Sequence, residues 1–262
     1  MNAWCELPRP TRNGAVEAGD GLLNLSPAVR REYLKLPGDL AALTRSFGIA
    51  LSSRLQRDSA ILTFAIECTD RLLDAIAQPD RRARFCADVV SCLRGDAFPG
   101  DDLAPELVGW LAQLRELAQG RQVHHTVCRI VRELLGNSEQ MRTTRSHGRF
   151  VQCAVREGRL MAELLLLILA EVSTPQFDGF MRRLSAPANL CDKLRDARRD
   201  FRRGEMAIQP TLAFRARLAC ELLRRTFSLG IFCLGNGRLL AWGIQSLLTE
   251  LIWFRFSKSH SR

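Results

Sequence analysis

Apolar residues recur along most of this chain at steps of three and four positions. The pattern holds from Gly38 onward and is typical of helices that bury one face. No stretch shows the two-residue alternation of a strand. Glycine and proline residues interrupt the pattern and divide it into about seven or eight helices, with breaks predicted at Pro79, 95–102, Gly120, Gly136, 174–175, 204–210 and 235–237. The sequence therefore predicts an all-α protein built as a single helical bundle.

The first 35 residues do not share this pattern. Prolines and glycines punctuate them closely, and no period is sustained. We therefore predict a loosely ordered segment over 1–35 and an all-helical domain over 36–262. No repeat of fixed length is present, which argues against a solenoid.

The composition agrees with a folded helical domain and adds one unusual feature. Of the 262 residues, 47% are apolar, which is ample for a buried core. The net charge of +10 comes almost wholly from arginine, because the only lysines are Lys35, Lys193 and Lys258. The planar guanidinium group suits phosphate and diphosphate oxygens. A basic surface can also bind nucleic acid, but a single tyrosine and the lack of interleaved basic and aromatic residues argue against that partner.

The nine cysteines favour a reduced, cytoplasmic protein. Their number is odd, no two form a Cys-x-x-Cys pair, and most have apolar neighbours, which is typical of core residues rather than of a disulfide or metal framework. The chain opens without a signal pattern, and the apolar run 164–170 is too short to span a bilayer. The apolar stretch 239–256 holds Gln245, Glu250 and Arg255. It fits a helix packed on the bundle or one in peripheral contact with a membrane surface, and both remain open.

Two aspartates stand out within the predicted helix 60–74. Asp70 and Asp74 are four residues apart and therefore lie on one helix face. Their neighbours Ile66 and Leu73 are apolar, so the acidic pair is costly unless a cation or a basic group compensates it. Hard carboxylate oxygens at this spacing suit Mg²⁺, which keeps several waters and takes phosphate oxygens as further ligands.

A second acidic ladder lies in the predicted helix 188–204. Asp192, Asp196 and Asp200 follow one another at four-residue steps down one side. If the two ladders face each other across the bundle, they form a carboxylate-lined cavity that can hold Mg²⁺. The alternative is a solvated, salt-bridged face, because six basic residues are interspersed with the second ladder: Lys193, Arg195, Arg198, Arg199, Arg202 and Arg203.

Three segments, in the same order, resemble the motifs of the squalene/phytoene synthase family. Residues 46–50 resemble the Ser-Phe-x-x-Ala stretch near the start of that family. Residues 70–74 resemble its first Asp-x-x-x-Asp motif, and 195–204 resemble its Arg-Asp-x-x-x-Asp-x-x-x-Gly signature. The likeness covers residues 46–210, and the ordered set is much more specific than any one motif.

The resemblance implies an all-α class I isoprenoid synthase bundle that joins two prenyl diphosphates of fifteen or twenty carbons head to head. In that family, Mg²⁺ assists departure of the diphosphate, and the resulting carbocation is coupled to a second prenyl chain in an apolar tunnel. By resemblance, the catalytic residues and Mg²⁺ ligands are Asp70, Asp74, Asp196 and Asp200, with Asp192 as a further ligand. The residues that contact the substrate diphosphate or line the tunnel are Ser46, Phe47, Arg195 and Arg199.

The motifs also depart from the family. Arg71 stands where a second acid is common, and Glu67 where a basic residue is often found. Helix 150–170 has no tyrosine and only one glycine, Gly158, where the family has tyrosines and paired glycines. The stretch 156–159 is typical either of a close helix approach or of a surface charge cluster. Two other functions stay open: a terpene cyclase that acts on one prenyl diphosphate, and a non-catalytic relative that acts as an assembly or binding protein.

Overall fold

Eight helices make up the part of the chain that the structure describes. A computed structural model describes residues 36–96, 103–235 and 237, and within them it contains no strand. The prediction of an all-α bundle with about eight helices is therefore confirmed. The predicted segment 1–35 and the stretch 239–256 lie outside the described residues. The helices are α1 (Leu36–Arg45), α2 (Ser53–Asp74), α3 (Pro79–Arg94), α4 (Pro105–Gly120), α5 (His124–Thr143), α6 (His147–Ile168), α7 (Pro175–Arg203) and α8 (Leu212–Leu234).

Short-range chemistry fixes most of the helix ends. At the starts of α2, α6, α7 and α8, a serine or threonine side chain accepts a hydrogen bond from the backbone amide three residues later; these residues are Ser52, Ser146, Thr174 and Thr211. Proline stands in the first turn of α3, α4 and α7, where its missing N–H costs nothing. Gly95 and Gly204 end α3 and α7 with φ of 83° and 74°, a conformation that favours glycine.

The predicted break at Gly136 is wrong. Gly136 lies inside α5, and the chain breaks instead at residues 144–146, where Ser146 caps α6. One glycine inside a helix costs only about 1 kcal/mol relative to alanine, which the packing of its neighbours readily outweighs. Leu135 and Asn137, on either side of it, are both buried.

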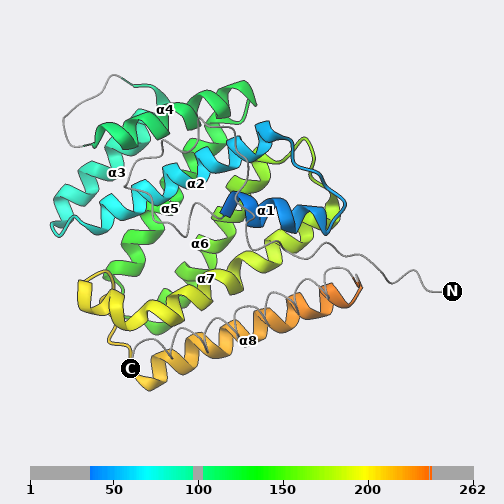
Figure 1. Cartoon of the computed structure of the whole chain (residues 1–262). Coiled ribbons are helices and arrows are strands. Elements are labelled where there is room, and N and C mark those ends of the chain that lie inside the picture. The colour runs from blue at the N-terminus through cyan, green and yellow to red at the C-terminus, as the bar shows by residue number, and fades with distance from the viewer. Residues whose placement is uncertain (1–35, 97–102, 236, 238–262) are drawn as a thin grey trace, which may run out of the picture.

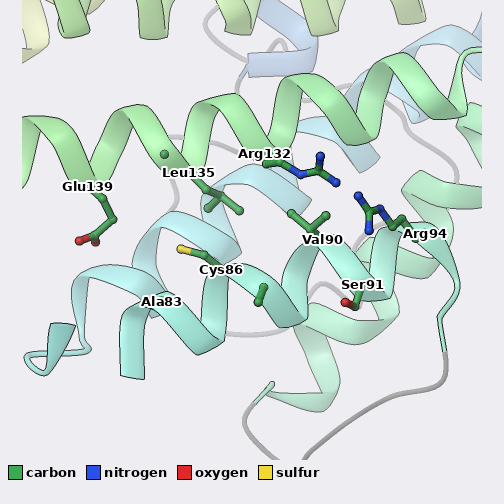
Figure 2. Close-up of a pocket in the computed structure, with 10 residues that line it drawn as sticks. Ala83, Cys86, Val90, Ser91, Arg94, Arg132, Leu135 and Glu139 are labelled. Carbon is green, nitrogen blue, oxygen red and sulfur yellow. The ribbon is translucent and has the colours of Figure 1, made fainter. Parts of the chain in front are cut away.

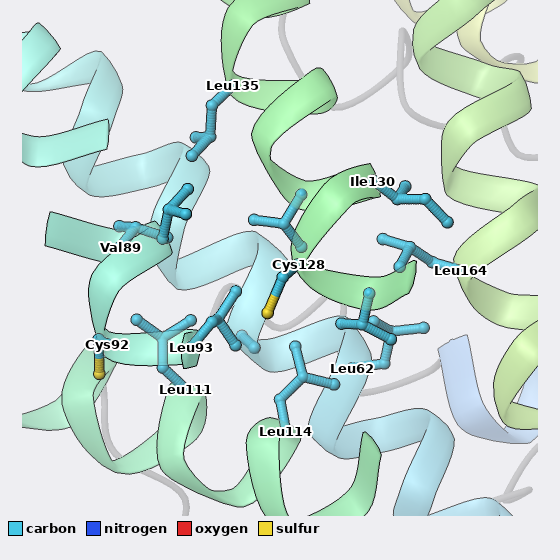
Figure 3. Close-up of a cluster of buried hydrophobic side chains, with 14 of the residues drawn as sticks. Leu62, Val89, Cys92, Leu93, Leu111, Leu114, Cys128, Ile130, Leu135 and Leu164 are labelled. Carbon is cyan, nitrogen blue, oxygen red and sulfur yellow. The ribbon is translucent and has the colours of Figure 1, made fainter. Parts of the chain in front are cut away.

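The helices pack around α6, which contacts α2, α5, α7 and α8 (Figure 1). α7 lies against α6 on one side and α8 on the other, so α8 forms an edge of the bundle. The largest hydrophobic cluster is formed by side chains from the five helices α2, α3, α4, α5 and α6. It includes Leu62, Leu93, Leu111 and Leu164 (Figure 3). Each fully buried leucine contributes roughly 1.5–3 kcal/mol relative to an exposed one, so this cluster holds α2 firmly against its neighbours.

Gly158 marks a close approach of α6 to α7, while Arg156 in the same stretch belongs to an exposed charge cluster with Glu133, so both interpretations of 156–159 apply. A Cβ atom at this position would lie 2.4 Å from the backbone oxygen of Ser185 and 3.2 Å from the Cα of Ala186. Only glycine therefore fits here without moving a helix. The contact falls next to Pro187, a proline inside α7.

Among the described helices, none is both long and apolar enough to cross a membrane. No disulfide links the eight cysteines of the described residues. Five of them are buried and one is half-buried, while Cys191 and Cys220 are exposed.

Candidate functional site

Charged residues from α2, α6 and α7 meet around one lysine. The Nζ of Lys193 on α7 donates to the Oε2 of Glu157 on α6, at 3.1 Å. The charge of Lys193 also interacts with the carboxylates of Asp70 on α2 and Asp200 further along α7. We refer to the following residues as the acidic site: Glu67, Asp70, Asp74, Glu157, Lys193, Asp200 and Glu205. Two of the predicted aspartate positions, Asp70 and Asp200, thus share a basic neighbour.

Asp70 carries the most strongly perturbed carboxyl of the acidic site. Its side chain is open to solvent, yet protein surrounds it closely enough that burial raises its pKa to about 7. The charge of Asp74 raises the pKa further, and Lys193 lowers it. Asp70 makes no hydrogen bond or direct ion pair with another described residue. Burial and a like charge therefore disfavour the ionised form of Asp70, and additional positive charge beside it would favour that form.

Asp74 already has a partner. The Nη2 of Arg142 on α5 donates to its Oδ1 at 2.6 Å, and the Arg142 side chain is only 8% exposed. Glu205, just beyond α7, interacts with both Asp74 and Arg142, and burial together with the charges of Asp74 and Asp200 raises its pKa. Arg142 therefore ties the end of α2 to α5 and compensates the acidic residues at this end of the site.

The second ladder has the ion pairs of a salt-bridged face, and one of its members also interacts with the acidic site. Its members are ion-paired along the helix: Asp192 with Arg195 at 2.9 Å, and Asp196 with Arg199 at 3.0 Å. Arg199 also contacts Asp200 at 3.3 Å. Asp200 nevertheless interacts with Lys193 and Glu205, so it faces the acidic site, and burial raises its pKa. Asp192 is the most exposed of the three, at 59%.

The donors of the acidic site fit Mg²⁺ in chemistry but do not form a closed cage. Among residues 36–96 and 103–235, no three His, Cys, Asp or Glu side chains lie close enough together to hold a metal ion. Mg²⁺ needs no such cage, since it is usually bound by one or two carboxylates together with water and substrate phosphates. Asp70 and Asp74 are two such carboxylates, but Arg142 already pairs with Asp74. Burial, followed by the charge of Asp74, is what raises the pKa of Asp70.

Ser46 and Phe47 lie in the turn after α1, at the other half of α7. The ring of Phe47 packs at 5.3 Å from the rings of both Phe177 and Phe180. Phe180 precedes Asp196 by sixteen residues, which is roughly 24 Å along a helix. Phe47 is therefore part of the core between α1 and the start of α7. Arg195 and Arg199, the other predicted substrate contacts, are 68% and 42% exposed beside the second ladder.

Four residues at or beside the acidic site do not stand out as site residues in the sequence: Glu157, Asn189, Lys193 and Arg142. Asn189 holds Glu157 in place, because its Nδ2 donates to the Ala154 carbonyl at 2.7 Å and to Glu157 Oε2 at 2.8 Å. One signal was available, since Lys193 is one of three lysines in an arginine-rich chain. For Arg142 no signal existed, because its partner Asp74 is 68 residues away in sequence.

Two surface hollows lie elsewhere on the molecule. A cavity of about 400 Å³ between α3 and α5 has Cys86, Val90 and Leu135 on its walls, with Arg94 and Arg132 at one end (Figure 2). Another, of about 430 Å³, lies beside the end of α7 and is lined by Phe201 and Pro210 among others. Neither hollow includes an aspartate of the acidic site, so neither corresponds to the predicted prenyl tunnel.

Comparison with known proteins adds no relative. No family model, no curated protein and no solved structure matches this chain.

Proposed function

We propose that the acidic site binds the diphosphate group of a prenyl diphosphate together with Mg²⁺, and that the chain is a prenyltransferase of the squalene/phytoene synthase type. One observation carries the proposal: Asp70 of the first motif and Asp200 of the second both interact with Lys193, inside an all-helical bundle. The order and spacing of the motifs in the sequence support the same assignment.

In this proposal, residues of the acidic site and the arginines beside it each bind a different part of the Mg²⁺–diphosphate group. Mg²⁺ bound by Asp70 and Asp74 supplies positive charge that stabilises the departing diphosphate. Lys193 points its ammonium into the same group of carboxylates and can donate hydrogen bonds to phosphate oxygens. Arg195 and Arg199 are exposed at the edge of the site, where a guanidinium group can take two phosphate oxygens at once.

A non-catalytic binding protein is the second candidate, and particular contacts favour it. The ion pair between Asp74 and Arg142 and that between Asp196 and Arg199 occupy carboxylates that an enzyme of this type needs for metal. A chain with these pairs can bind a diphosphate through its basic residues without turning it over. A terpene cyclase uses the same site as the first candidate and differs from it only in product.

Ligand-induced stabilisation tests whether the acidic site is the binding site. Thermal unfolding is measured for wild type, Asp70→Asn and the control Asp88→Asn on α3, each with Mg²⁺ alone, a non-hydrolysable prenyl diphosphate analogue alone, and both. At 100 times its Kd, a ligand stabilises by about 2.7 kcal/mol, which raises the Tm by roughly 5–11 °C. We expect the full shift in wild type and Asp88→Asn, and a much smaller one in Asp70→Asn. Equal shifts in all three proteins would exclude Asp70 from the site.

Turnover separates the candidates. Wild type is incubated with Mg²⁺ and labelled prenyl diphosphates of fifteen or twenty carbons. A joined product supports the prenyltransferase, and a cyclised or hydrolysed monomer supports the cyclase. Binding without Mg²⁺-dependent turnover supports the non-catalytic protein.

A further inference from the structure

The outer side of α8 carries a row of exposed apolar side chains. Leu223, Phe227, Ile231 and Leu234 follow one another at steps of four, four and three, so they lie on one side of the helix. We call these four residues the α8 stripe. Their exposed fractions are between 56% and 71%, and Leu212 at the start of α8 is 85% exposed. Side chains of this size rarely gather on a free surface unless another element covers them.

The opposite side of α8 is already occupied by the bundle. Phe214 and Leu218 are fully buried there, and Phe214 packs its ring against Phe150 of α6. α8 runs along the edge of the molecule beside α7 (Figure 1). The four residues of the stripe are exposed, whereas Phe214 and Leu218 face the bundle. Contacts within the described residues therefore account for the buried face of α8 but not for the apolar stripe on its other side.

We propose that the α8 stripe is covered by residues 239–256 of the same chain, folded back along α8 as an antiparallel helix. The stretch has apolar residues at steps of four, three, four and three, namely Leu240, Ile244, Leu247, Leu251 and Phe254. This heptad-like spacing matches the stripe, as expected of two helices that pack along their length.

The connection between the two stretches favours this occupant over any other. α8 ends at Leu234, and four residues, Gly235-Asn236-Gly237-Arg238, separate it from the stretch 239–256. Two helices joined by a loop of two to five residues usually lie antiparallel to each other. A covalently attached segment also has a high effective concentration at the stripe, which a separate partner lacks.

The stretch 239–256 is long enough to cover the α8 stripe but shorter than α8, which provides an internal control. Eighteen residues of helix span roughly 27 Å, whereas the 23 residues of α8 span about 34 Å. Counted back from the turn, the returning segment reaches the whole α8 stripe but ends short of Leu212. Phe227 is thus covered by the returning segment, and Leu212 stays exposed. A second copy of the chain or a membrane surface has no such limit in length.

Amide hydrogen exchange on the full chain tests the proposal, with sedimentation to establish that the protein is monomeric. In wild type, we expect the backbone amides of 239–256 to exchange more slowly than those of an unfolded chain, by a factor of about ten or more. Phe227→Asp should remove this protection. Leu212→Asp, the matched control on the same helix, should leave it unchanged, and protection of α2 and α6 should persist in both variants.

Three results would overturn the proposal. The first is rapid exchange of 239–256 in the wild-type monomer. The second is protection that appears only when sedimentation shows a dimer, which would assign the stripe to a second copy. The third is protection that appears only after addition of phosphatidylglycerol vesicles, which would assign it to a membrane surface.

Discussion

Gly158→Ala should weaken the contact between α6 and α7 that positions Glu157 and Lys193. The added Cβ would lie 2.4 Å from the Ser185 oxygen, whereas an ordinary contact is at least 3.4 Å, so the helices must separate by about 1 Å. Backbone atoms cannot rotate away as a side chain does. Overpacking of this kind costs about 1–3 kcal/mol, and we expect the upper end of that range. The better helix propensity of alanine returns up to about 1 kcal/mol, which leaves a net loss of roughly 2 kcal/mol.

Gly136→Ala is the matched control, because it makes the same chemical change inside α5. Nothing lies within 4 Å of a Cβ at this position, so only the propensity gain of about 0.5–1 kcal/mol applies. Urea unfolding followed by far-UV circular dichroism should therefore move the two midpoints in opposite directions. Thermal unfolding should lower the Tm of Gly158→Ala by roughly 4–8 °C. If Gly158→Ala is as stable as Gly136→Ala, α6 and α7 do not approach as closely as described.

Three further predictions concern charged groups and thiols. Arg142→Met leaves the Asp74 carboxylate without its 2.6 Å partner and should lower the free energy of unfolding in urea by about 1–3 kcal/mol. Adding Asp74→Asn to the same chain should restore part of this loss. If Arg142→Met loses no stability, the pair does not stabilise the fold. The pKa of Asp70 is raised to about 7, so between about pH 4 and 7 the folded protein binds more protons than the unfolded chain, and the contribution of Asp70 to stability falls as pH rises. Asp70→Asn should therefore gain stability relative to wild type across that window in the absence of ligand, and a constant difference would contradict the shift. Among the eight described cysteines, Cys191 and Cys220 should be alkylated first in the native protein, because they are exposed, whereas burial raises the pKa of Cys86 to about 11. Mass spectrometry after timed alkylation measures this order. Labelling of the buried Cys68 at the same rate would contradict it.

Much of the helical framework followed from the sequence, because helix ends depend on residues within one turn of each other. The apolar period predicted helices throughout the described residues, and Thr174 with Pro175 marked the start of α7. The same local reasoning failed at Gly136, where burial of its neighbours outweighs the preference of glycine.

The sequence predicted the spacing of the acidic residues in the candidate site but not their partners. The spacing of Asp70 and Asp74 on one helix face is a local property, and it is present in α2. The spacing could not show that the two residues differ, with Asp74 bound to Arg142 and Asp70 left with a raised pKa. That difference depends on which helix packs beside the end of α2.

Tertiary packing alone brought the acidic site together. Glu157 and Asn189 meet across 32 residues of sequence, and Arg142 meets Asp74 across 68. Such pairs form only where helices approach closely, and the approach of α6 to α7 depends on the missing side chain of Gly158. The period of a single helix records which face is buried but not which helix covers it. The partners of Asp70, Asp74 and Lys193 were therefore decided by the fold, while the helices that carry these residues were determined by the sequence.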